Sequence, residues 1–191
     1  MKIILASNSP RRKEILTQLG IKFEVMPSEY KEKMKDMQPE ELAMYFAERK
    51  AMSVADRISE EALVIGADTI VYCNEVIGKP KDSKDVIKML KRLSGKSHSV
   101  ITGVSVIITP TLNKITTYEK TMVKFKSLNE EEILSYISTG EPMDKAGAYA
   151  IQGIGSLLVE KINGCYFNVM GLPVFKLSKM LEAFDYRILG R

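Results

Sequence analysis

The chain has 191 residues, of which 45% are hydrophobic and 27% are charged, so it can bury a sizeable core and is not a disordered or collagenous chain. Its formal net charge of +4 suits an anionic ligand but provides no basic stripe for duplex nucleic acid. Two cysteines, Cys73 and Cys165, and one histidine, His98, supply neither a disulfide framework nor a zinc site. The opening apolar run, residues 3–6, is too short for a signal peptide or a membrane span. We therefore expect a soluble, cytoplasmic protein without nucleic-acid or membrane partners.

The first part of the chain alternates strand and helix patterns. In chain order, the patterns predict a strand at 2–6, a helix ending at Gly20, a strand around Val25, a charged loop at 29–38, a helix from Pro39 through Ile58 and a buried strand at 62–71.

The second part adds a hairpin and further helices. The patterns predict a helix from Asp82 or Ser83 to Gly95, strands at 98–109 and 114–125 that form an antiparallel hairpin, a helix ending at Gly140, strands at 156–162 and 165–170, and a helix after Pro173. Ser127-Leu128-Asn129-Glu130 has capping-box spacing, and Asn163-Gly164 is a strong hairpin signal. Since no repeat or linker divides the chain, we expect an α/β fold with a mixed sheet.

The loop between the first strand and the first helix has the composition of a phosphate site. The polar run 7–10 precedes Arg11 and Arg12. Free backbone N–H groups at a helix start and two guanidinium groups favour a bound anion. The alternative is an ordinary capped helix with solvated arginines, and the loop alone does not decide between these interpretations.

Asp68 is the sharper signal, because it lies within the apolar run 63–71. A carboxylate buried there is costly unless a cation, a metal or hydrogen bonds compensate it. Residues at the carboxyl ends of sheet strands often face a ligand, so Asp68 and Thr69 are candidates for a site. The alternative is a structural aspartate that caps backbone amides.

Four further features are weaker. Lys79 lies in a Gly-Lys-Pro-Lys loop that suits phosphate, and Gln152 could read the edge of a base through its amide donor and acceptor, although both positions also suit ordinary turns. Residues 93–97 imitate the end of a P-loop, but a helix precedes them, so we exclude a P-loop nucleotidase. His98 is expected to be a half-buried polar strand residue.

Several separated blocks then fall into one pattern. They are residues 5–12 (LASNSPRR), 66–69 (GADT), 78–80 (GKP), 94–98 (SGKSH), 141–149 (EPMDKAGAY) and 168–173 (NVMGLP). Together, and in this order over nearly the whole chain, they resemble the Maf family.

The resemblance implies a nucleoside triphosphate pyrophosphatase, in which water attacks the α-phosphate and a nucleoside monophosphate and pyrophosphate are released. It implies a divalent metal, Mg²⁺ or alternatively Mn²⁺, a homodimer and a house-cleaning role. It also implies one Maf-like domain over residues 1–191, with two lobes around a central cleft. The implied fold is a long twisted mixed sheet flanked by helices, similar to that of the inosine triphosphate pyrophosphatases.

The resemblance also assigns roles to individual residues. It implies that Asp68 is the proton acceptor and that Glu32, or alternatively Glu29, joins Asp68 at the metal. The implied specificity residues are Arg11, Thr69 and Gln152, and the implied phosphate-binding residues are Ser7, Arg12, Lys50 and Lys79.

The form of two blocks resembles one branch of the family. The Ser-Pro-Arg-Arg run together with Gln152 is similar to the branch that hydrolyses dTTP and UTP, with modified pyrimidine nucleotides as an extension. The 7-methyl-GTP branch carries Trp after the proline and an acidic residue in place of Gln152. The alternatives are a 7-methyl-GTP pyrophosphatase and a nucleotide-binding regulator of septum formation.

Overall fold

The computed structural model describes residues 1–190, which divide into two compact units. Unit 1 contains residues 1–68, residues 102–119 and the C-terminal segment from Gly171. Unit 2 contains residues 69–101 and 120–170. Three strands continue along the chain from one unit into the other: β3 (Ala62–Tyr72), β5 (Ser97–Thr109) and β6 (Asn113–Phe125).

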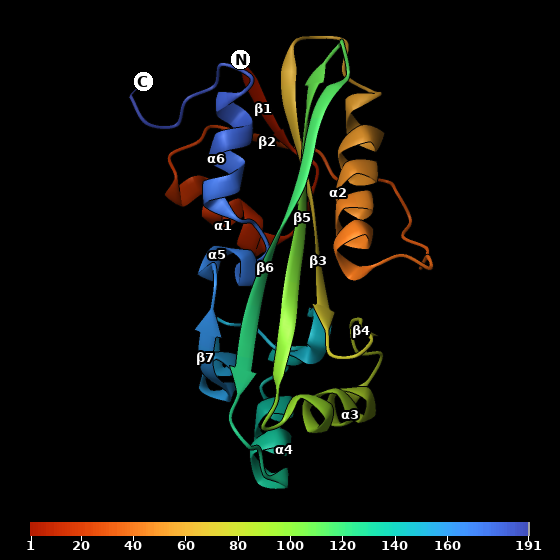
Figure 1. Ribbon diagram of the computed structural model, residues 1–191, viewed down its shortest axis with the longest axis vertical. Coiled ribbons are helices and arrows are strands. Elements are labelled where there is room, and N and C mark those ends of the chain that lie inside the picture. Colours follow the sequence, from red (N-terminus) through yellow and green to blue (C-terminus); the bar gives the residue numbers. More distant parts are fainter. Residues whose placement is uncertain (191) are drawn as a thin grey trace. The chain divides into compact units, whose positions relative to one another are not determined.

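The strands form a mixed seven-stranded sheet in the order β2-β1-β3-β5-β6-β7, with β4 paired to β3 (Figure 1). In unit 1, β1 (Lys2–Leu5) pairs in parallel with β2 (Glu24–Val25) and with the start of β3. In unit 2, β4 (Val76–Ile77) pairs antiparallel to β3 and β7 (Val159–Asn163) pairs antiparallel to β6. The predicted α/β class with a mixed sheet is confirmed.

The described residues form six α-helices, and all except the fifth lie where the sequence patterns predict a helix. They are α1 (Pro10–Gln18), α2 (Pro39–Ala55), α3 (Ser83–Leu93), α4 (Glu130–Ser138), α5 (Tyr166–Met170) and α6 (Val174–Glu182). Three 3₁₀ helices complete the fold: η1 (Glu141–Asp144), η2 (Ala146–Ala148) and η3 (Gly153–Leu158). None of these helices is both long and apolar enough to cross a membrane.

In unit 1, α2 packs directly on the sheet, as Figure 1 shows for α2 and β3. Ala51 and Val54 of α2 share a buried cluster with Ile4 of β1 and Val64 of β3. Gly66 of β3 permits this close approach, because a Cβ there would lie 2.3 Å from the carbonyl oxygen of Ala47. Glycine is therefore required two positions before Asp68, and α2 lies close to the strand that carries this carboxylate.

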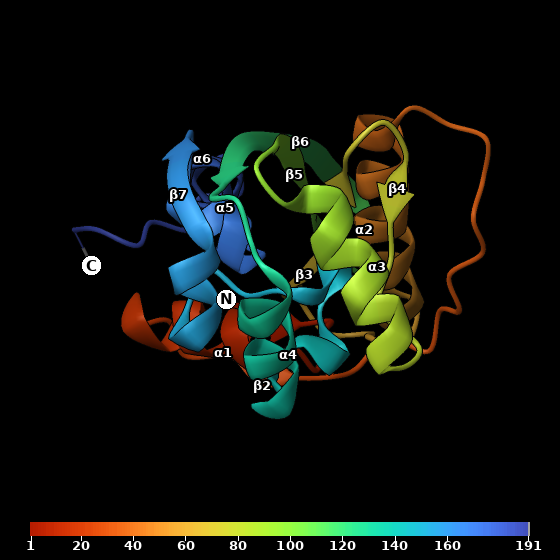
Figure 2. The same cartoon turned by 90° about the horizontal axis from the view of Figure 1, so that it is seen from below.

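In unit 2, α3 and α4 lie side by side (Figure 2). Leu90 of α3 and Ile133 of α4 share a buried cluster with Phe125 of β6 and Tyr149. The amphipathic spacing of α3 predicts this packing, and the Asp82 side chain caps the helix by accepting a hydrogen bond from the backbone N–H of Asp85.

Three predictions are wrong. The capping box of α4 is formed by Asn129 and Glu132 rather than by Ser127 and Glu130, because the helix begins two residues later than the motif suggested. Residues 166–170 form helix α5 instead of a strand after the Asn163-Gly164 turn. His98 lies in β5 as expected but is buried rather than half-buried, with 2% of its surface exposed.

Candidate functional site

Unit 1 contains an ion cluster centred on Lys50 of α2. The Lys50 Nζ lies 2.6 Å from Oδ1 of Asp68, to which it donates a hydrogen bond, and 2.5 Å from Oε1 of Glu32. Asp68 comes from β3 and Glu32 from the loop before α2. The structure therefore brings together three of the residues singled out in the sequence, from positions far apart in the chain.

The Asp68 carboxyl is held in a nearly water-free position, with 8% of the residue exposed. Burial raises the pKa of this carboxyl above its ordinary value, and the Lys50 ammonium opposes that rise by stabilising the charged form. Since a raised pKa makes a carboxylate a stronger base, this environment suits general-base chemistry while the neighbouring cation favours ionisation.

Arg12 is the second cation of the cluster and is also buried, with 8% exposed. Its Nε donates to the carbonyl oxygen of Gly171 at 2.8 Å, and its Nη1 donates to Oγ of Ser7 at 3.1 Å. Burial lowers the pKa of the Arg12 guanidinium, and Asp68 opposes this effect. The position of Gly171 in this contact was not predicted, although the block 168–173 had been part of the family pattern.

The start of α1 lies at the loop that the sequence indicates as a candidate anion-binding site. Its N-cap residue Ser9 makes no side-chain cap, Pro10 occupies the first turn, and that turn has no acidic residue. The Ser7 Oγ also accepts a hydrogen bond from the Ser9 backbone N–H at 3.2 Å. The Arg11 Nε is buried without a hydrogen-bond partner in residues 1–190, so this guanidinium retains a donor for a ligand.

The loop that carries Glu32 is anchored to α2. Ser28 and Ser53 share a hydrogen bond between their hydroxyl oxygens at 2.7 Å, and the Tyr30 ring packs against Phe46 with centroids 6.4 Å apart. Glu29, the alternative to Glu32, is exposed and pairs with Arg57 at 2.8 Å. Of the two acidic residues considered, the structure therefore places Glu32 in the ion cluster. The serine pair carried no recognisable sequence signal.

Three predicted site residues belong to unit 2. Thr69 directly follows Asp68 on β3 and is partly exposed. Lys79 is exposed in the loop after β4, where Gly78 accepts a hydrogen bond through its carbonyl oxygen from the Gly147 N–H at 3.0 Å. Gln152 is partly exposed and is the N-cap residue of η3.

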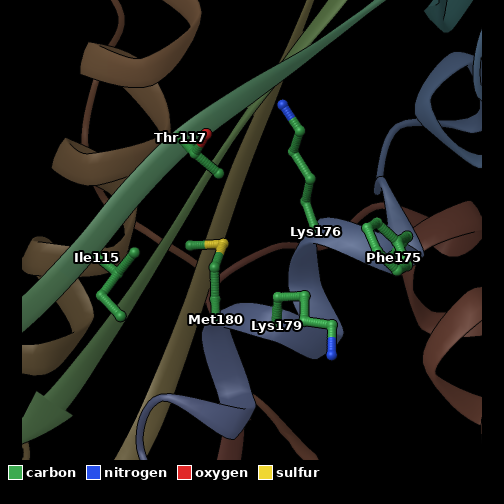
Figure 3. A pocket seen from close by; sticks show the side chains of 6 residues that line it. All are labelled: Ile115, Thr117, Phe175, Lys176, Lys179 and Met180. Atoms are coloured by element: carbon green, nitrogen blue, oxygen red, sulfur yellow. The ribbon is translucent and has the colours of Figure 1, made fainter.

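A separate pocket of about 320 Å³ lies in unit 1 between β6 and α6 (Figure 3). Two of its lining residues come from β6 and four from α6, namely Ile115, Thr117, Phe175, Lys176, Lys179 and Met180. Lys179 pairs with Glu182 and Lys176 pairs with Glu119, so both cations already have acidic partners. None of the predicted site residues lines this pocket.

The donor set of the ion cluster fits one class of metal ion. Within residues 1–190, no three acidic, histidine or cysteine side chains converge as a complete metal cage. Glu32 and Asp68 nevertheless converge on one cation, the Lys50 ammonium. Mg²⁺ is commonly held by one or two carboxylates together with waters and substrate phosphates, so two carboxylates suit this ion better than Zn²⁺.

The chain is similar to known proteins over nearly its whole length. Residues 2–184 match the family described as Maf-like protein. A protein of Thermoanaerobacter sp. (strain X514) named dTTP/UTP pyrophosphatase is 51% identical over 99% of this chain and 100% of its own length. Proteins of the same name from Aquifex aeolicus (50% identical over 97% and 96%) and Caldicellulosiruptor saccharolyticus (48% over 98% and 97%) are also similar.

A solved structure with a lower similarity is the nucleoside-triphosphatase, or dITP/XTP pyrophosphatase, of Mycobacterium abscessus. It is 15% identical, with a TM-score of 0.43, over 67% of this chain and 76% of that chain.

Proposed function

The chain belongs to the Maf family, and we infer that it is a nucleoside triphosphate pyrophosphatase that hydrolyses dTTP and UTP to the monophosphate and pyrophosphate. The observation that carries this function is the buried Asp68 carboxylate, held 2.6 Å from the Lys50 ammonium and near the buried Arg12. A buried acid among converging cations suits water activation beside a polyphosphate.

Asp68 acts as the general base in this proposal. Its carboxylate accepts a proton from water while the water oxygen bonds to the α-phosphorus. The bond between that phosphorus and the bridging oxygen toward the β-phosphate then breaks, and pyrophosphate leaves with the electron pair. The contact with Lys50 supports this role, because the ammonium favours the ionised carboxylate that can take the proton.

The cations bind the triphosphate, which carries nearly four negative charges. Arg12 supplies a guanidinium whose orientation is fixed by Ser7 and Gly171. Lys50 supplies a point charge from α2, and Lys79 supplies another from the loop after β4. These four side chains (Ser7, Arg12, Lys50 and Lys79) form the proposed phosphate-binding set, which replaces a P-loop.

Glu32 and Asp68 are the residues proposed to hold a divalent metal, Mg²⁺ or alternatively Mn²⁺. When bound, such an ion neutralises charge on the phosphates and lowers the pKa of water. The Lys50 ammonium lies against both carboxylates and balances part of their negative charge.

Base selection is assigned to Arg11, Thr69 and Gln152. The unpartnered Nε of Arg11 and the amide of Gln152 supply directed hydrogen-bond groups, which favour one arrangement of donors and acceptors on a base. We also propose a cytoplasmic homodimer. Its support is the side chain of Phe175, which is 71% exposed beside the apolar pocket and would be covered in a dimer.

The experiment that tests the function is pyrophosphate release with Mg²⁺ from a panel of canonical and modified nucleotides that includes 7-methyl-GTP. We expect turnover of dTTP and UTP, and we expect Asp68→Asn to lower it by about 10²- to 10⁴-fold, the usual contribution of a general base. Hydrolysis in ¹⁸O-labelled water should place the label in the monophosphate, because attack is at the α-phosphorus.

Asp56→Asn is the matched control, because Asp56 is an exposed aspartate at the end of α2. This variant should retain wild-type turnover. Label in pyrophosphate would contradict attack at the α-phosphorus. A folded wild-type protein that binds dTTP but turns over no nucleotide would contradict the enzymatic function and favour a nucleotide-binding regulator.

A further inference from the structure

The turn that carries Gln152 is held by a carboxylate from another segment of unit 2. Glu141, in η1, accepts a hydrogen bond from the backbone N–H of Gly155 at 2.9 Å through Oε1 and from that of Ile154 at 3.1 Å through Oε2. Both N–H groups lie in the first turn of η3, whose N-cap residue is Gln152. Glu141 therefore performs the capping that an N-cap side chain normally provides.

This arrangement leaves the Gln152 amide available. Gln152 makes no side-chain cap to its own helix, and its carboxamide has no hydrogen-bond partner within residues 1–190. An Asn, Asp, Ser or Thr at this position would use its side chain to accept a hydrogen bond from a backbone N–H group at the start of the helix. Because Glu141 satisfies those backbone groups, the amide of Gln152 can address a ligand while its backbone stays fixed.

The carboxylate of Glu141 is itself held in place. The Tyr136 hydroxyl, on a residue with 2% of its surface exposed, donates to Oε1 of Glu141 at 2.9 Å. A Cβ on Gly155 would lie 2.5 Å from the Ala150 carbonyl oxygen and 2.6 Å from the Tyr136 hydroxyl. At Gly155 the backbone of η3 therefore packs against Glu141 and Tyr136 so closely that a side chain at this position would clash.

We propose that Glu141 is a positioning residue for base selection, which fixes the turn so that the Gln152 amide meets only one base edge. The proposal rests on the proposed function, in which Gln152 reads the base. Thymine and uracil present an N3–H donor beside a carbonyl acceptor, whereas cytosine presents an acceptor beside an amino donor. Because the Gln152 carboxamide has no partner of its own, it can turn by 180° to match either pattern, so the fixed backbone acts by setting the position and direction from which the amide reaches the base edge.

The test compares kcat and KM for UTP and CTP in the wild type, Glu141→Gln and Glu141→Ala. We expect Glu141→Ala to raise the KM for UTP about tenfold, to change kcat less than about threefold, and to reduce the UTP/CTP ratio of kcat/KM about tenfold. Glu141→Gln keeps one oxygen acceptor and should lie between the other two proteins. A residue that only stabilised the fold would lower the active fraction for both nucleotides and leave their ratio unchanged.

Hydrogen exchange gives a second measurement that does not depend on activity. The amides of Ile154 and Gly155 should both exchange at least about tenfold faster in Glu141→Ala than in the wild type, and Glu141→Gln, which keeps one oxygen acceptor, should accelerate them less. Tyr136→Phe keeps the buried ring and should accelerate the same two amides less. Glu131→Ala is the matched control, since Glu131 is an exposed carboxylate on α4 without an interaction in the described chain.

The outcomes separate the inference from the function on which it rests. A wild type that turns over UTP selectively, with the same UTP/CTP ratio in Glu141→Ala, would overturn the role of Glu141 and leave the function intact. A wild type that does not distinguish UTP from CTP would overturn both the proposed base selection and this inference. Unchanged exchange at Ile154 and Gly155 in Glu141→Ala would overturn the capping contact directly.

Discussion

Asp68 of unit 1 and His98 of unit 2 are both buried titratable side chains, but their surroundings are opposite in character. In unit 1, Asp68 is surrounded by charge, with Lys50 at 2.6 Å and Arg12 nearby. In unit 2, His98 is surrounded by aromatic rings: the centroids of Phe125 and Tyr149 lie 5.1 and 5.4 Å from that of the imidazole. The His98 Nε2 shares a 2.8 Å hydrogen bond with the Tyr149 hydroxyl.

The difference in surroundings distinguishes a candidate functional site, around Asp68, from a structural core, around His98. Buried ion clusters add little net stability, because the desolvation cost offsets the attraction between the charges. A neutral hydrogen-bonded pair among rings avoids that cost and adds packing. The unit 1 cluster is therefore best explained by chemistry, whereas His98 is best explained by the fold. Substitutions in the first should reduce activity, and changes at the second should reduce stability.

The largest effect should come from Lys50→Met. This substitution removes the ammonium that lies against both Asp68 and Glu32, and with it a cation for the phosphates. We expect kcat/KM for UTP to fall about 10²- to 10³-fold, the scale for loss of one preorganised group that stabilises developing charge. Arg12 remains as a cation that acts on Asp68, so the variant should fold. Steady-state kinetics on protein checked by circular dichroism measures the loss.

Lys114→Met provides the control for this substitution. Lys114 of β6 pairs with Glu48 of α2, the helix that also carries Lys50, but both side chains are partly exposed. Activity within about twofold of the wild type is expected, since exposed ion pairs contribute little. Equal losses in Lys50→Met and Lys114→Met would contradict a special role for the buried cluster.

The next effect is on stability and depends on pH. Burial lowers the pKa of His98 to about 4, from 6.5 in the unfolded chain. Between these values the unfolded chain takes up a proton that the folded protein does not, so stability is complete above pH 6.5 and is lost as the pH falls to 4. The loss should be about 3 kcal/mol, at about 1.4 kcal/mol for each unit of pKa. Urea unfolding at a series of pH values measures it.

His98→Gln isolates this contribution, because His98 is the only histidine in the chain. The raised pKa of Asp68 contributes with the opposite sign, and it is common to both proteins. The wild type should lose more stability than His98→Gln between pH 6.5 and 4. Parallel curves for the two proteins would show that His98 takes up its proton as readily in the folded state.

Sequence patterns indicate the candidate site residues more clearly than the contacts that those residues make. Asp68 was visible because a lone carboxylate interrupts an apolar run. The contact between Lys50 and Glu32 forms because the loop before α2 folds back against this helix. No local sequence pattern predicts that the loop folds back. The contacts of Glu141 could not be predicted from the sequence either. Its partners at Ile154 and Gly155 are backbone N–H groups, which every residue except proline possesses.

The fold shows the same limit. Hydrophobic periodicity predicted β3 and α2, yet the Asn163-Gly164 signal predicted a strand at 165–170 where the structure has α5. The Thr121 hydroxyl exchanges hydrogen bonds with the backbone of Cys165 and accepts one from the Asn168 amide. These contacts with a strand more than forty residues away determine the local conformation, so a turn signal read in isolation was overridden.

A smaller effect is expected from Arg12→Lys, because Arg12 is a proposed phosphate-binding residue and also makes buried hydrogen bonds within the fold. Arginine donates from two nitrogens to Gly171 and Ser7, and the single ammonium of lysine cannot reproduce this geometry. We expect the KM for UTP to rise about tenfold and the unfolding free energy to fall by about 1 kcal/mol, the net value of a typical hydrogen bond. Arg49→Lys, at an exposed arginine of α2, should change neither quantity. A loss of stability without any change in KM would place Arg12 with the core rather than the site.

The smallest effect concerns the start of α4 and should leave activity unchanged. The Asn129 side chain accepts a hydrogen bond from the Glu132 N–H at 2.8 Å, and the Glu132 carboxylate accepts one from the Asn129 N–H at 2.9 Å. Asn129→Ala should therefore cost about 1 kcal/mol of unfolding free energy, as loss of an N-cap does. Ser127→Ala, at the position that the sequence motif favoured, should cost less than about 0.5 kcal/mol, the usual range for a surface substitution. Urea unfolding of the two variants compares the caps, and a larger cost at Ser127 would mean that α4 begins earlier in solution. Because α4 packs on α3 within unit 2, whereas the residues of the ion cluster belong to unit 1, kcat/KM for UTP should be the same in both variants, which keeps the stability of unit 2 separable from the chemistry of Asp68.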